Sequence, residues 1–107
     1  GVALQDTQPV LTWDSQVEVM IQAYKPYGVN MDGSLTPLSP APLPAEQAGN
    51  SVGATYRFVD TTRPTSPYTS YLLIVYEADG KIWEISLGRN PAYARQFIPI
   101  GGVTGKR

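Results

Sequence analysis

Residues 70–88, SYLLIVYEADGKIWEISLG, decide the fold of this chain of 107 residues. Two runs of apolar, β-branched and aromatic residues flank Asp79-Gly80, a dipeptide typical of the two-residue type I′ turn. The pattern predicts an antiparallel hairpin in which Ala78 faces Lys81. In that register six apolar side chains share one face and are expected in the core. They are Leu72, Ile74, Tyr76, Trp83, Ile85 and Leu87.

The opposite face of the hairpin is mixed in character. It combines Glu77 and Glu84 with apolar side chains, so it is too apolar for a fully solvated sheet face. We therefore expect this face to be covered by the proline segment, residues 35–48, by a short helix or by another molecule. The residues expected to form this interface are Leu73, Val75, Ile82 and Glu84.

Period-two alternation predicts further strands outside the hairpin. Residues 16–24 and 51–60 alternate between two faces, and each segment is expected to form a half-buried strand. Residues 10–13 are expected to form a short strand. Residues 97–100 are expected to form a closing strand at a sheet edge, where Pro99 is tolerated.

Proline, glycine and polar residues mark the segments between these strands. Residues 1–9 are expected to form an arm, and residues 25–34 a loop. Residues 35–48 contain four prolines and are expected to form an extended connector, because proline fixes φ and removes a backbone donor. Asn90 followed by proline is typical of a helix start. Residues 101–107 are expected to form a flexible tail.

These patterns predict a single domain, because a chain of this length forms one modest core. The fold class is all-β with one short helix. We expect a small antiparallel barrel or sandwich of about five or six strands.

The composition narrows the class of protein further. Charged residues make up 16% of the chain, against about 25% in typical domains. This favours an extracellular or virion protein. The net charge is −1 with no basic cluster along the domain, which argues against nucleic acid as a partner. The longest apolar run, residues 71–76, is too short to span a membrane. We expect no cofactor, because histidine and cysteine are absent.

Motif-like stretches do not meet the requirements of known sites. Residues 28–39 resemble a calcium loop only in part, because Ser39 stands where a carboxylate is required. The glycines near Lys106 lack the spacing of a phosphate loop. Glu77 and Glu84 are expected diagonally across one hairpin face, like the paired carboxylates of glycoside hydrolases. A domain this small offers little room for a sugar cleft, so solvated charges that keep the hairpin soluble are favoured. The sequence therefore indicates no metal site and no catalytic motif.

Several tyrosines are expected in loops or on outward-facing positions, where an apolar ring with a polar tip suits binding. These candidate binding residues are Tyr24, Tyr27, Tyr68, Tyr71 and Tyr93. Arg89 lies beside the expected helix start, where anions are attracted, and it is a further candidate.

Three functions are consistent with these patterns. The first is a non-catalytic interaction module: a structural or assembly domain of a larger particle or surface appendage, which binds protein and associates with itself. The second is a carbohydrate-binding module in which the tyrosines contact a glycan. The third is a small enzyme that uses Glu77 and Glu84 or a serine–lysine pair. It ranks last, because the chain has no histidine or cysteine.

Overall fold

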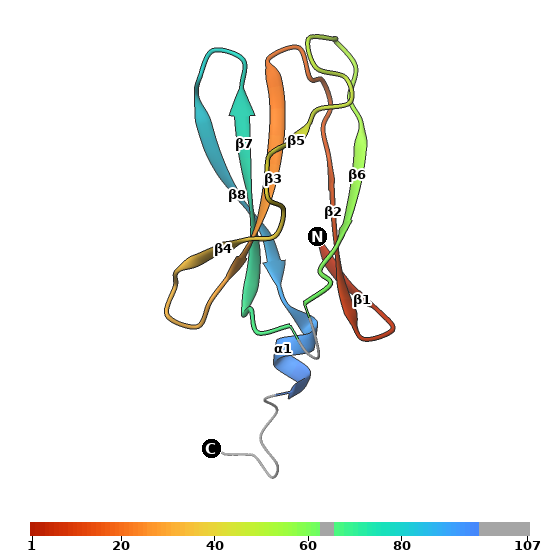
Figure 1. Ribbon diagram of the computed structural model, residues 1–107. Helices are drawn as coiled ribbons and strands as arrows, with labels where there is room; N and C mark the ends of the chain where they lie inside the picture. Colours follow the sequence, from red (N-terminus) through yellow and green to blue (C-terminus); the bar gives the residue numbers. More distant parts are fainter. Residues whose placement is uncertain (63–65, 97–107) are drawn as a thin grey trace.

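Eight strands form two antiparallel sheets that pack face to face in the computed structural model, which describes residues 1–62 and 66–96. One sheet has the order β1 (Val2–Gln5), β2 (Gln8–Asp14), β6 (Thr55–Val59). The other has the order β4 (Leu35–Pro37), β3 (Ile21–Val29), β7 (Ser70–Glu77), β8 (Ile82–Arg89), and β5 (Leu43–Pro44) also pairs with β3. Helix α1 (Pro91–Gln96) follows β8 (Figure 1). The predicted all-β fold with one short helix is confirmed, and it is a sandwich.

The core lies between the sheets and is rich in aromatic rings. Trp13 of β2 stacks on Tyr56 of β6 with ring centroids 5.4 Å apart, and Tyr24 of β3 lies 4.9 Å from Tyr56. Leu11 and Leu73 are almost completely buried beside them. Aromatic rings from both sheets therefore join the two layers, since each ring buries a large apolar area.

The turn between β7 and β8 differs from the predicted type I′ turn. The Glu77 N–H donates to the Lys81 carbonyl at 2.8 Å, and the Gly80 N–H donates to the Glu77 carbonyl at 3.0 Å. Gly80 has a φ of 91°, whereas Asp79 has no positive φ, which a type I′ turn requires at both central residues. The loop therefore has three residues, 78–80, and ends in a left-handed glycine.

This longer loop shifts the hairpin register by one residue. Tyr76 pairs with Ile82 instead of Trp83, and Val75 pairs with Trp83. A shift of one residue exchanges the two faces of β7 relative to β8, so the β7 half of the predicted core face was wrong. Trp83, Ile85 and Leu87 of β8 face inward as expected. Residues expected on the mixed face now point into the sandwich from β7. These are Tyr71, Leu73 and Val75, which are 1%, 1% and 4% exposed.

The predicted core residues of the hairpin differ in how far they are buried. Ile74 and Leu87 are buried, while Leu72 and Tyr76 are half-buried. Trp83 and Ile85 share the inward face of the sheet with Leu73 and Val75, yet they are exposed. The turn end of β8 therefore carries large apolar side chains that face the interior but remain exposed.

The first strands also differ from expectation. The predicted arm over residues 1–9 was wrong, because β1 forms a hairpin with β2, in which Val2 pairs with Leu11. The strand predicted over 16–24 begins only at Ile21 and continues to Val29, into the predicted loop. Residues 15–20 instead connect the smaller sheet to the larger one and are called the crossing segment. The predicted strand over 51–60 is confirmed in its second half, as β6.

Proline within β3 is accommodated by its neighbours. Pro26 pairs with Leu73 of β7, and its carbonyl accepts a hydrogen bond from the Leu38 N–H at 3.0 Å. β4 ends at Pro37 and β5 begins at Leu43, so the other side of β3 has a gap at this point. A residue without an N–H is tolerated where no partner strand needs that donor.

The proline segment packs on its own domain. Its two short strands, β4 and β5, both pair with β3, and Ala45 joins the core. The helix start is also confirmed, since Asn90 Oδ1 accepts the Ala92 N–H at 2.9 Å. The strand predicted over 97–100 and the tail over 101–107 lie outside the described residues. Within the described chain, α1 is too short to cross a membrane.

Candidate functional site

An open apolar groove runs between the two sheets at the β8 side of the sandwich. Its volume is about 580 Å³. Leu73 and Val75 of β7 form its floor, and Trp83 and Ile85 of β8 form one wall. The other wall combines Trp13 of β2 with the start of the crossing segment, residues 15–17. The groove is therefore an uncovered part of the core rather than a cleft on the outer surface.

The groove is open because the smaller sheet covers only part of β8. β1 pairs with β2 from Gln8 to Leu11, and Val2 lies against Gly88, at the α1 end of β8. Trp83, near the turn, is not covered by β1 and is 52% exposed. Ile85 is 45% exposed. One half of β8 is thus closed by β1, and the other half is open.

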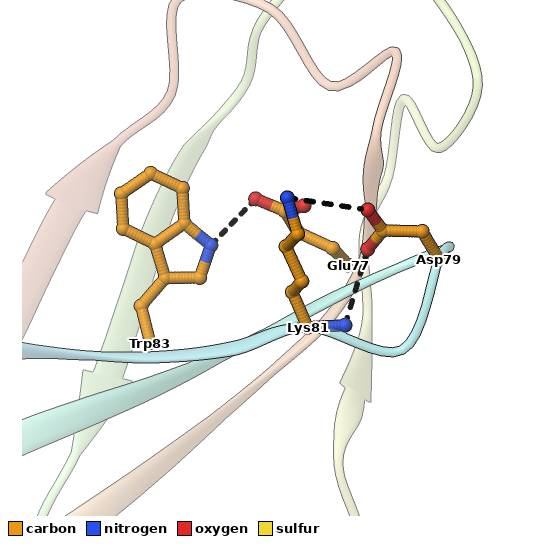
Figure 2. A network of polar contacts seen from close by, with 4 residues as sticks. All are labelled: Glu77, Asp79, Lys81 and Trp83. Carbon is orange, nitrogen blue, oxygen red and sulfur yellow. Dashed lines mark hydrogen bonds and ion pairs between the residues drawn. The ribbon is translucent and has the colours of Figure 1, made fainter.

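One hydrogen bond orients the Trp83 indole at the groove (Figure 2). Its Nε1 donates to Glu77 Oε2 at 2.6 Å. In the same turn, the Lys81 N–H donates to Asp79 Oδ1 at 3.1 Å, and the Lys81 ammonium lies 3.9 Å from Asp79 Oδ2. A large exposed ring that is already oriented loses little side-chain entropy when it is buried by a partner.

The outer edge of β8 is free within the part of the chain that the structure describes, where β8 pairs with β7 alone. The Lys81 carbonyl accepts from Glu77, so Lys81 faces β7. Because the direction alternates along a strand, Ile82, Glu84 and Ser86 direct their N–H and C=O groups away from β7. Such an edge is a template for pairing with a further strand.

The crossing segment carries a buried carboxylate next to the groove. Glu18 is fully buried and accepts hydrogen bonds from the hydroxyls of Ser15 at 2.8 Å, Tyr24 at 2.7 Å and Tyr56 at 2.7 Å. The Gln47 N–H also donates to it at 2.8 Å. This one side chain therefore ties the crossing segment to β3, to β6 and to the turn after β5.

The hydrogen bonds determine the ionisation of this cluster. Burial alone would raise the Glu18 pKa, but the hydrogen bonds from Tyr24, Tyr56, Ser15 and Gln47 lower it below its ordinary value of 4.5. Burial and the Glu18 carboxylate raise the pKa of Tyr56 to about 12 and that of Tyr24 further. Glu18 is thus an ionised structural anchor, sealed from substrates.

A second buried polar cluster closes the opposite end of the sandwich. The Tyr71 hydroxyl donates to Asp60, and burial raises its pKa. The Asn90 amide donates to Ser66 Oγ at 2.8 Å and to the Tyr68 carbonyl at 2.7 Å. These contacts fix the start of β7 and of α1. Like the Glu18 cluster, this one is enclosed in the fold.

The candidate tyrosines do not form a common surface. Tyr24, Tyr68 and Tyr71 are 4%, 7% and 1% exposed, so their expected outward position was wrong. The Tyr68 ring packs directly on Gly28 and meets Tyr71 edge to face. Tyr27 on β3 and Tyr93 on α1 are only half-buried, and Lys25 Nζ lies 5.6 Å from the Tyr27 ring centroid. A row of aromatic platforms for a glycan is absent from this set.

The four predicted interface residues do not share one face of the larger sheet, and neither do the two paired carboxylates. Leu73 and Val75 form the groove floor, whereas Ile82 and Glu84 lie on the outer face of the same sheet and are exposed. Glu77 lies on the inner face with Trp83, so the paired arrangement expected for Glu77 and Glu84 was wrong. Arg89 is exposed at the end of β8.

The described residues contain no cluster of three or more acidic side chains that would suit a metal ion. No protein family model, curated protein or solved structure matches the chain.

Trp13, at the groove wall, provides a test of how the aromatic core is held. Within the described part of the chain, its buried Nε1 has no hydrogen-bond partner. We expect Trp13→Phe to change the free energy of unfolding by less than about 1 kcal/mol, because it removes an unsatisfied donor along with some buried area. Trp13→Ala should cost about 3–5 kcal/mol. Urea unfolding of both variants checks this, and equal losses would contradict it.

Proposed function

We propose that this chain is a non-catalytic interaction module that binds protein through its groove face, defined as the open groove together with the free edge of β8. The observation that supports this most directly is the position of Trp83 and Ile85. Both point toward the interior of the sandwich, yet both are about half exposed. Large apolar side chains next to an uncovered core indicate an interaction surface.

The groove face has the components of a protein contact. Its apolar floor and walls favour burial of apolar side chains, at about 25 cal/mol per Å² removed from water. Tryptophan is enriched among the residues that dominate binding energy in interfaces. The free backbone groups of Ile82, Glu84 and Ser86 add hydrogen bonds to an incoming strand, the mode known as β-augmentation.

Self-association is the form of binding that we propose, as expected for a domain that assembles into a larger particle or surface appendage. Each copy presents the open groove and, among the described residues, an unpaired β8 edge, so two copies can bind each other through the same surface. A symmetric pair that uses one surface twice is the commonest oligomer.

Sedimentation velocity over a micromolar to millimolar concentration series tests the proposal. We expect the full chain to associate as its concentration rises. The double variant Trp83→Ser/Ile85→Ser should associate at least about tenfold more weakly, because it removes two apolar contacts from the groove wall. Both side chains are exposed, so circular dichroism should show an unchanged fold.

The matched control is Val52→Ser. Val52 is 52% exposed, like Trp83, but it does not line the groove. An equal loss of association in this control would place the contact elsewhere on the surface. A chain that remains monomeric across the whole series would overturn the proposed function.

A further inference from the structure

The free edge of β8 allows only a few ways for two copies to pair. When a two-fold axis perpendicular to the sheet relates two antiparallel β8 strands, one residue of β8 lies opposite its own copy. This follows because paired residues must lie on the same face of the sheet. Along the exposed middle of β8, that residue is Glu84, Ile85 or Ser86. Glu84 at the centre would set two carboxylates directly opposite each other, which is unfavourable.

A bulge in β8 distinguishes the two remaining arrangements. Ser86 pairs with Leu72 and Gly88 pairs with Tyr71, so Leu87 is one residue in excess. Arg89 consequently lies on the outer face, the face that also holds Glu84. Among the outer-face residues of β8, Glu84 is the last one before Ser86 and Arg89 is the first one after it.

Charge complementarity selects Ser86 as the centre. Pairing around Ser86 sets Glu84 opposite Arg89 of the second copy, and the symmetry makes this contact twice. Pairing around Ile85 sets Glu84 opposite Ser86 and gives neither charge an opposite partner. Ser86 also directs its N–H and C=O toward the free edge, so the two copies of this residue can exchange both hydrogen bonds.

The same arrangement places the open half of β8 in each copy beside the half of β8 that β1 covers in the other copy. β8 runs from its open end at Trp83 to the end that β1 covers beside Gly88. Antiparallel pairing therefore sets the open end of one copy beside the β1 end of the second copy. β1 of each copy then lies next to the uncovered wall formed by Trp83 and Ile85.

Building on the proposed self-association, we infer that two copies pair antiparallel through their β8 edges around Ser86, with Glu84 of each copy opposite Arg89 of the other. The larger sheets join into one continuous sheet across the pair. The partner is a second copy of this chain, recognised by strand pairing, by two ion pairs and by closure of both grooves.

Charge reversal tests the register. Glu84→Arg alone and Arg89→Glu alone each create two like-charge contacts, so each variant should associate about tenfold more weakly than the unmodified chain. An equal mixture of the two variants should associate as well as the unmodified chain, because both contacts in the mixed pair are again attractive. Added salt should reduce these differences, since the charges are exposed. Sedimentation velocity compares the unmodified chain, the two variants and their mixture.

Glu46→Arg is the control, because it makes the same charge change at an exposed carboxylate outside β8 and should leave association unchanged. The inferred register would be overturned if neither charge reversal weakened association, or if mixing the two variants did not restore it. Either result would leave the proposed interaction module intact. Absence of association in the unmodified chain would instead refute the proposed function itself.

Discussion

Gly53→Ala is expected to destabilise the fold by more than about 3 kcal/mol, or to prevent folding. A Cβ at position 53 would lie 1.8 Å from the Ser15 carbonyl oxygen and 2.8 Å from the carbonyl carbon of Gln16. These are backbone atoms, and they are held in place. The Ser15 N–H donates to the Ala54 carbonyl at 2.9 Å, and the Ala54 N–H donates to Ser15 Oγ at 3.0 Å.

Urea unfolding, followed by circular dichroism, measures the effect. Gly33→Ala is the matched control, since a Cβ there meets open space although φ is 88°. That variant should cost only about 1–3 kcal/mol, from the left-handed backbone alone. If the two variants have similar stability, the close approach of the crossing segment to residue 53 does not limit the fold.

Glu18→Gln is expected to cost about 3 kcal/mol in the free energy of unfolding. All four groups around the carboxylate donate hydrogen bonds, and bonds to a charged acceptor contribute about 1.5–3 kcal/mol each. Glutamine removes the charge and sets an N–H₂ group against these donors. Glu46→Gln, at an exposed carboxylate, should change the stability little.

The pH dependence of stability gives an independent measurement of the same anchor. The Glu18 pKa is lower in the folded chain than its ordinary value of 4.5. The stabilisation is therefore fully present above 4.5 and is lost as the pH falls through the lower, folded pKa. Urea unfolding at a series of acidic pH values should show this loss in the unmodified chain and a smaller one in Glu18→Gln. Parallel curves would show that Glu18 does not contribute.

The fold class was predictable because alternation and turn chemistry are local. The two runs around Asp79-Gly80 form adjacent antiparallel strands, and the helix begins at Pro91 as expected. The turn type was what the sequence left open, and it sets the register of the hairpin. Ala-Asp-Gly also fits a three-residue loop that ends in a left-handed glycine, and local sequence does not distinguish this loop from the shorter one.

The crossing segment shows where alternation alone misleads. Residues 16–20 alternate like a strand, but their backbone is organised around Glu18, whose N–H donates to the carbonyls of Asn50 and Val52. These partners are distant in sequence. Glu18 occupies a polar position of that alternation, where a strand would expose it, yet it is fully buried while Val17 and Val19 are exposed. The local pattern therefore predicted the wrong face.

The sequence predicted only some of the residues that line the groove. Leu73 and Val75 were predicted as part of an interface, and they form the groove floor. Trp83 and Ile85 were assigned to the sealed core, and both do face inward, but their exposure depends on how far β1 covers β8. Coverage of one sheet by the other is a tertiary property that a single strand's pattern does not contain.

The contrast between the two tryptophans has a practical consequence for spectroscopy. The chain contains only Trp13, which is buried in the core, and Trp83, which is half exposed at the groove wall. In a Trp13→Phe background all indole emission arises from Trp83. A shift of that emission to shorter wavelength would then report closure of the groove directly, so contact at this surface can be followed without an attached dye.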